Sequence, residues 1–90
     1  MVLDQALDYV LEELERDPES AFLRETPGYQ EMLERAVDAL SPKLKTVVIL
    51  RFYEGMQLSE IAQITGTNLN TVKSRLYKAL GKLRESLKEA

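Results

Sequence analysis

The sequence has no cysteine and no histidine among its 90 residues. The absence of cysteine excludes a disulfide and a thiolate metal site, and the absence of histidine removes the commonest general base and metal ligand. No apolar run approaches the roughly 20 residues that cross a bilayer, and the N-terminus has no basic-then-apolar pattern of a signal peptide. The sequence therefore predicts a soluble cytoplasmic protein without a metal or cofactor.

The net charge of −3 is distributed unevenly along the chain. Residues 1–40 hold eleven acids and three bases, a net charge of −8, whereas residues 41–90 hold four acids and nine bases, a net charge of +5. Such asymmetry between halves is typical of a basic binding surface joined to an acidic arm. A chain of 90 residues supports one compact domain, or a small domain with an arm.

Apolar residues recur at helical spacing in five segments, which predicts an all-α fold. The first segment is an acidic helix that is expected to end near Asp17-Pro18, because proline disfavours helix in the residue before it. Its apolar stripe consists of Leu3, Leu7, Val10, Leu11 and Leu14. The expected organisation is an acidic N-terminal helix and linker over residues 1–28, followed by a small helical domain over residues 29–90.

Four more helices are expected over residues 29–40, 42–54, 58–65 and 69–88. Ser41 and Pro42 form a start signal, because serine can cap the amides of a first turn and proline fits the first helical position. Gly66 is a natural stop, and Asn68 is a good cap for the last helix. The residues expected to face inward are Met32, Leu33, Ala36, Val37 and Leu40, then Leu58, Ile61, Ala62 and Ile64, and finally Leu69, Val72, Leu76, Leu80, Leu83 and Leu87.

Residues 58–84 have the order of a helix-turn-helix: a short helix, a tight turn at Gly66-Thr67-Asn68, and a longer basic helix. The second helix of such a motif lies in a DNA major groove. Residues 73–88 contain six bases and one acid. The face opposite the apolar stripe carries Asn70, Thr71, Ser74, Tyr77, Lys78 and Gly81, flanked by Arg75 and Lys82 on one side and Lys73 on the other.

This mixture of side chains suits a DNA groove. Short hydroxyl and amide groups can approach base edges, and Lys and Arg can reach guanine acceptors or phosphates. Tyr77 can offer an apolar face to a thymine methyl. The alternative is an ordinary solvated face on an amphipathic helix. Arg51, which interrupts the most apolar helix, likewise has two interpretations: an arginine that snorkels at the domain edge, or a phosphate contact from behind the turn.

Residues 36–88 resemble region 4 of bacterial sigma factors of the sigma-70 class, and are most similar to the extracytoplasmic-function group. The residues that carry the resemblance are Leu40-Ser41-Pro42, Val48-Ile49-Leu50-Arg51, Gly55, Glu60-Ile61-Ala62, Gly66, Thr71-Val72-Lys73-Ser74-Arg75-Leu76, Lys78-Ala79-Leu80 and Leu83-Arg84. The resemblance implies recognition of double-stranded DNA at a promoter −35 element. The predicted DNA-binding residues are Arg51, Asn68, Asn70, Thr71, Lys73, Ser74, Arg75, Tyr77, Lys78 and Lys82.

The resemblance also implies protein partners. Region 4 grips the flap tip of the RNA polymerase β subunit through an apolar concavity, and anti-sigma factors cover that surface in the family. The candidate partner-binding residues are Leu44, Val47, Val48, Leu80 and Leu83.

Two residues depart from the family pattern. Asn70 stands where glycine is common, and Gly81 lies inside the last helix, where it costs roughly 1 kcal/mol relative to alanine. Nothing in the sequence resembles region 2, so the chain is not expected to melt a promoter by itself.

Other functions remain open at this point. The EIA-to-TVK spacing is shared with LuxR-type DNA-binding regulators, which would bind a palindrome as dimers. A protein-interaction module would use the acidic arm to bind a basic partner. An enzyme is the weakest case, because pairs such as Glu12 with Glu15 are usually solvated and no nucleophile–base pairing is present. Residues 1–17 are expected either to cover the basic face or to pack on the core, and the chain to be a monomer or a weak homodimer.

Overall fold

The computed structural model describes residues 12–13, 16 and 27–89. The predicted N-terminal helix and most of the linker therefore lie outside the described residues. From residue 27 onward the elements are α2 (Tyr29–Asp38), α3 (Pro42–Val48), the π-helix η2 (Ile49–Tyr53), α4 (Leu58–Thr65) and α5 (Leu69–Glu89). The described residues contain helices and turns and no strand, which confirms the predicted all-α fold.

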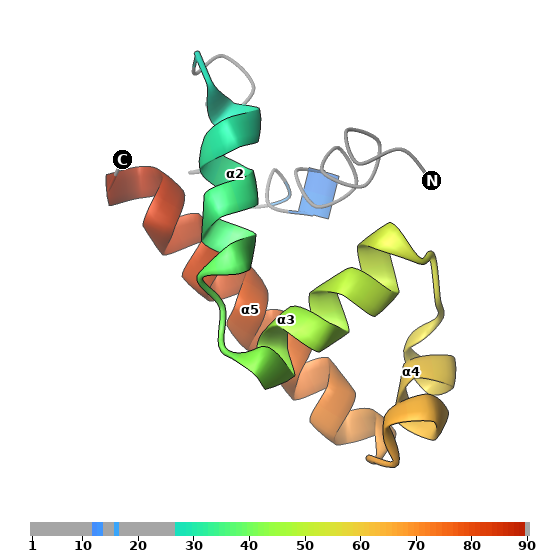
Figure 1. The fold of residues 1–90 in the computed structure, drawn as a ribbon. Coiled ribbons are helices and arrows are strands. Elements are labelled where there is room, and N and C mark those ends of the chain that lie inside the picture. The colour runs from blue at the N-terminus through green and yellow to red at the C-terminus, as the bar shows by residue number, and fades with distance from the viewer. Residues whose placement is uncertain (1–11, 14–15, 17–26, 90) are drawn as a thin grey trace.

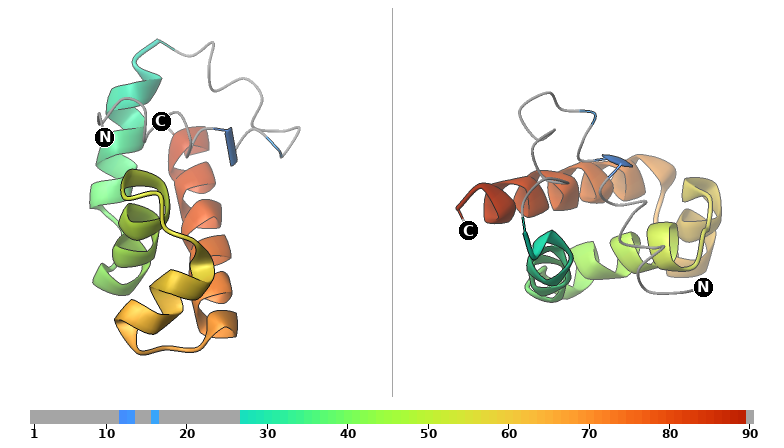
Figure 2. Two further views of the ribbon diagram at one scale, coloured as in Figure 1. Left: turned by 90° about the vertical axis from the view of Figure 1, so that its right-hand side faces the viewer. Right: turned by 90° about the horizontal axis from the view of Figure 1, so that it is seen from above.

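The 21-residue helix α5 organises the domain. Helices α2, α3 and α4 all contact α5, with α2 crossing its C-terminal half and α4 packing beside its first turns (Figure 1). The side view in Figure 2 shows α5 along one side and the shorter helices stacked along the other. One face of α5 is consequently buried along its length, and the opposite face is left open to solvent.

The core lies between α5 and the shorter helices. Its most buried members include Leu33, Val48, Ile61, Val72 and Leu83, each fully shielded from solvent. Burying an aliphatic side chain of this size contributes about 1.5–3 kcal/mol, so the core supplies the main stabilising term. The whole cluster is Leu33, Ala36, Val37, Leu40, Leu44, Val47, Val48, Phe52, Ile61, Ala62, Val72, Leu76, Ala79, Leu80, Leu83 and Leu87.

Two residues that were expected to face inward do not. Ile64 is 67% exposed and Leu69 is 38% exposed. Helix α4 meets α5 through Ile61 and Ala62, and Ile64 lies two residues further on, about 200° round a helix of 3.6 residues per turn. Leu69 begins α5 before that helix enters the core.

The third predicted helix is divided in two. The α-helical pattern ends at Val48, and η2 continues as a wider turn in which the amide of Glu54 donates to the Ile49 carbonyl at 3.0 Å. A π-turn adds one residue per turn, so it rotates the following side chains relative to the α-helix before them. Phe52 is thereby buried, and Arg51 is left half-buried.

The local signals at the helix ends are mostly confirmed. Gly66 ends α4 in the left-handed region at φ 69°, and the Asn68 carboxamide oxygen accepts the Thr71 amide at 2.8 Å. The predicted Ser41 cap is wrong, because its side chain makes no capping hydrogen bond. A capping box between Gln57 and Glu60 begins α4, which the sequence analysis did not predict.

Candidate nucleic-acid interface

The turn between α4 and α5 is held by a compact set of hydrogen bonds. The Thr65 hydroxyl donates to the Ile61 carbonyl at 2.6 Å and lies 2.9 Å from the Thr67 hydroxyl. The Thr67 amide donates to the Ala62 carbonyl at 3.0 Å. Together with the left-handed Gly66, these bonds fix the angle at which α5 leaves the turn, as a helix-turn-helix requires.

An open groove runs along the solvent side of the first half of α5. Its lining residues are Ser41, Lys43, Leu44, Asn68, Asn70, Thr71, Ser74, Arg75, Lys78 and Lys82. Seven of the ten residues predicted to bind DNA therefore lie together. Most of these side chains are exposed, and they combine amide and hydroxyl groups near the start of α5 with cationic groups further along.

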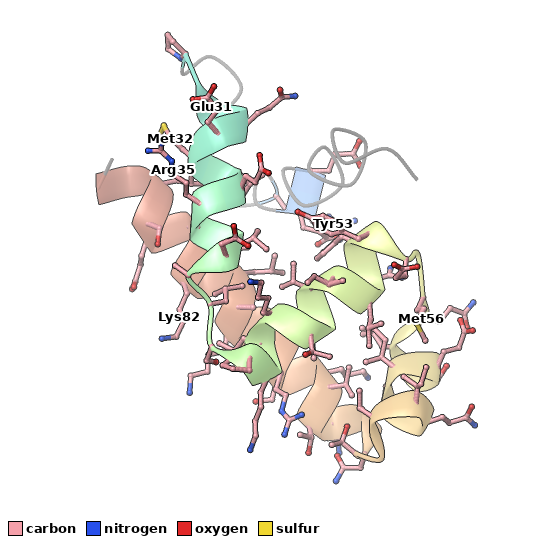
Figure 3. All side chains as sticks on the ribbon, viewed as in Figure 1. Glu31, Met32, Arg35, Tyr53, Met56 and Lys82 are labelled. Carbon is pink, nitrogen blue, oxygen red and sulfur yellow. The ribbon has the colours of Figure 1, made fainter. Side chains whose placement is uncertain are left out.

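The groove has one sign of charge. Lys43, Arg75, Lys78 and Lys82 line it, and no acidic residue does. Figure 3 shows Lys82 projecting from α5 into solvent. A groove lined by one sign of charge concentrates ions of the opposite sign, so this one favours a polyanion such as a nucleic-acid backbone.

Two lining residues, Ser41 and Lys43, come from another element. They lie at the start of α3, which packs against α5, and the sequence analysis did not assign them to the site. The two segments are about thirty residues apart in the chain, so periodicity within α5 gave no signal for them. Only the packing of α3 on α5 brings them to the groove.

Residues 30–83 match the family model of sigma-70, region 4. The chain belongs to this family. The aligned part of the chain is 54% identical over 55 residues to RNA polymerase sigma factor SigV of Bacillus subtilis, covering 61% of this chain and 33% of that protein. It is 45% identical over 56 residues to an RNA polymerase sigma-E factor of Streptomyces antibioticus, covering 62% of this chain and 31% of that protein.

A longer alignment reaches the RNA polymerase sigma-H factor of Pseudomonas aeruginosa, which is 30% identical over 83 residues, or 92% of this chain and 39% of that protein. The chain thus spans between about a third and two fifths of the length of these three relatives. No solved structure matches. Membership of the region 4 family, together with the helix-turn-helix and the cationic groove, supports a DNA-binding role of the sigma-factor kind.

Three of the ten predicted DNA-binding residues of this region 4 domain do not line the groove. Lys73 and Tyr77 are exposed on the other flank of α5, where Tyr77 is 69% exposed. Arg51 is half-buried in η2, and its Nη1 donates to the Met56 carbonyl at 2.9 Å. That bond ties the end of η2 to the segment that leads into α4, a structural role that neither interpretation of Arg51 included.

The five candidate partner-binding residues all lie in the core. Their exposed fractions range from 0% for Val48 and Leu83 to 5% for Leu44 and Leu80, with Val47 at 1%. In this structure they stabilise the fold from within and offer no exposed apolar surface. The reason is that α2, α3 and α5 pack on one another through those side chains, where the apolar stripes of the three helices meet.

A second hollow lies between α2, α3 and η2, lined by Glu34, Val37, Asp38, Lys45, Ile49 and Tyr53. Lys45 pairs with Asp38 at 3.1 Å. Burial raises the pKa of the Tyr53 phenol, and the nearby carboxylates of Glu34 and Asp38 raise the pKa further. This hollow therefore combines an apolar floor with an acidic rim, in contrast to the cationic groove.

The described residues hold no group of three or more acidic residues placed to bind a metal ion. Among the same residues, no helix has the length and apolar character needed to span a membrane.

Proposed function

We propose that this region 4 domain binds the −35 element of a promoter, with α5 in the major groove, and that it docks to the β flap of RNA polymerase. The curated relatives are RNA polymerase sigma factors by name, which supports the choice of partner. The observation that carries the DNA part is the groove, which has four cations, no acid and a row of amide and hydroxyl groups.

The groove residues divide by chemistry. Asn70, Thr71 and Ser74 lie near the start of α5, where a recognition helix contacts base edges, and their short polar groups can read donors and acceptors. Arg75 and Lys78 can reach guanine acceptors or phosphates. Asn70 adds a carboxamide where the family commonly has glycine, so we assign it a base contact that sets the sequence preference.

Flap docking is the second part of the proposal. Because Leu44, Val47, Val48, Leu80 and Leu83 are buried, we assign docking to the hollow between α2, α3 and η2. Half-buried Ile49 and Tyr53 give it accessible apolar surface on the helices where the resemblance predicts the flap contact.

The test is selection of duplexes from a random pool at two salt concentrations, with separate binding to a purified β-flap fragment. We expect enrichment of a short asymmetric motif, binding that weakens steeply with salt, and flap binding. Ser74→Ala with Lys78→Ala should abolish DNA selection and leave flap binding intact, and Ile49→Ser should do the reverse. Enrichment of a palindrome without flap binding would indicate a dimeric LuxR-type regulator. Failure of both interactions would leave a protein-interaction module.

A further inference from the structure

The groove has two walls, and only one of them belongs to the helix-turn-helix. The outer face of α5 forms one wall, and the start of α3 forms the other with Ser41 and Lys43. The side chain of Lys43 also borders a neighbouring hollow that it shares with Arg75, Thr46 and Thr65. Lys43 therefore lies beside Arg75 in two adjoining hollows, at the junction between α3 and α5.

We infer that Lys43 is a DNA-backbone anchor that fixes how α5 is rotated in the groove; this rests on the proposed function. A single helix in a major groove can turn about its own axis while its phosphate contacts slide. A cation on a second, rigidly packed element removes that freedom. Contacts to phosphates set orientation and register and carry no direct sequence information, so Lys43 positions the residues that read bases.

The charges around Lys43 support this assignment. Lys43 is exposed, and its neighbours in the groove are cationic or neutral, so no carboxylate of the groove competes with a phosphate for its ammonium group. Lys45, two residues along the same helix, is different. It is half-buried and pairs with Asp38 at 3.1 Å in the hollow on the other side of α3.

This contrast supplies a matched pair of variants. Lys43→Gln and Lys45→Gln each remove one positive charge from α3, so they change the net charge of the chain equally. The experiment measures affinity of the full chain for its selected duplex and for a scrambled duplex, over a range of salt concentrations. Thermal unfolding of both variants checks that the fold is retained.

We expect Lys43→Gln to weaken binding to both duplexes by the same factor and to reduce the slope of log affinity against log salt by about 1, as one lost phosphate contact requires. Lys45→Gln should leave that slope unchanged. Equal effects of the two variants would overturn the anchor while leaving the proposed function intact, and so would a Lys43→Gln effect confined to the selected duplex. If the wild-type chain binds neither duplex, the proposed function and the anchor both fail.

Discussion

At the residue scale, Gly66 and Gly81 show how one residue type can be required at one position and costly at another. Gly66 has φ 69°, in the region that other residues rarely adopt, whereas Gly81 has a helical φ inside α5. An added Cβ would meet nothing within 4 Å at either site. Space is therefore equal at the two positions, and backbone conformation alone separates them.

We expect Gly81→Ala to stabilise the domain by about 1 kcal/mol, because alanine loses less conformational freedom in a helix interior. Gly66→Ala should destabilise it by about 1–2 kcal/mol, the cost of a left-handed conformation for a residue with a Cβ. Urea unfolding of the two variants measures both changes. Destabilisation by Gly81→Ala would contradict the open space beside it and indicate the close approach that the sequence analysis raised.

Tyr53 gives a residue-scale prediction about pH. Burial, with the carboxylates of Glu34 and Asp38, raises its pKa above the ordinary value of 10.0. The folded state thus favours the neutral phenol more than the unfolded state does. The stability from this preference is fully present below pH 10.0 and is lost as the pH rises through the higher pKa of the folded state.

Absorbance titration of the phenolates tests this. Tyr53→Phe should remove the latest part of the titration curve, and Glu34→Gln should shift that part to lower pH by removing one of the causes. Tyr77→Phe, which removes a phenol far more exposed to solvent, is the control for amplitude. Loss of the earliest part of the curve in Tyr53→Phe would contradict the prediction.

At the scale of elements, the sequence predicted what local chemistry decides. Pro42 at the start of α3, the Gly66 stop and the Asn68 cap act within one turn of the residue concerned, so their positions could be inferred directly. The π-turn of η2 and the exposure of Ile64 could not be predicted, because both depend on how a short helix meets its neighbours. The place of Lys43 in the groove depends likewise on the packing of α3 against α5.

The connection between η2 and α4 yields a prediction at this scale. The bond from the Arg51 guanidinium to the Met56 carbonyl spans the turn at Gly55, which has φ 68°. Arg51→Met keeps a long apolar stem and removes the donor, so it should cost about 1.5 kcal/mol of unfolding free energy, the usual value for a hydrogen bond to a charged group. Thermal and urea unfolding measure the loss.

Arg35→Met, at an exposed arginine of α2, is the control and should change the unfolding free energy by less than about 0.5 kcal/mol. If Arg51→Met lowers DNA affinity without changing stability, the phosphate-contact interpretation of Arg51 holds and the structural one does not. If both quantities fall, DNA affinity is compared under conditions in which each variant is fully folded.

At the scale of the whole molecule, the distribution of charge opposes the proposed function. Residues 1–26 hold eight acids and two bases, a net charge of −6, whereas residues 27–90 hold seven acids and ten bases, a net charge of +3. The buried core of the described residues runs from Leu33 to Leu87, so the basic part has its own core without the acidic segment. The acidic segment lowers the attraction of the chain for DNA by charge alone, whatever structure it adopts.

We therefore expect removal of residues 1–26 to raise DNA affinity most at low salt, since charges act over about 30 Å at 0.01 M salt and only about 3 Å at 1 M. The gain should shrink steadily as salt is added. A full-length variant with Asp4, Asp8, Glu12 and Glu13 changed to their amides keeps the chain length and should reproduce most of the gain. A gain from deletion that persists at high salt, and that the amide variant lacks, would instead indicate that the segment physically covers the groove. Equal affinity of all three proteins at low salt would show that the acidic segment has no influence on DNA binding.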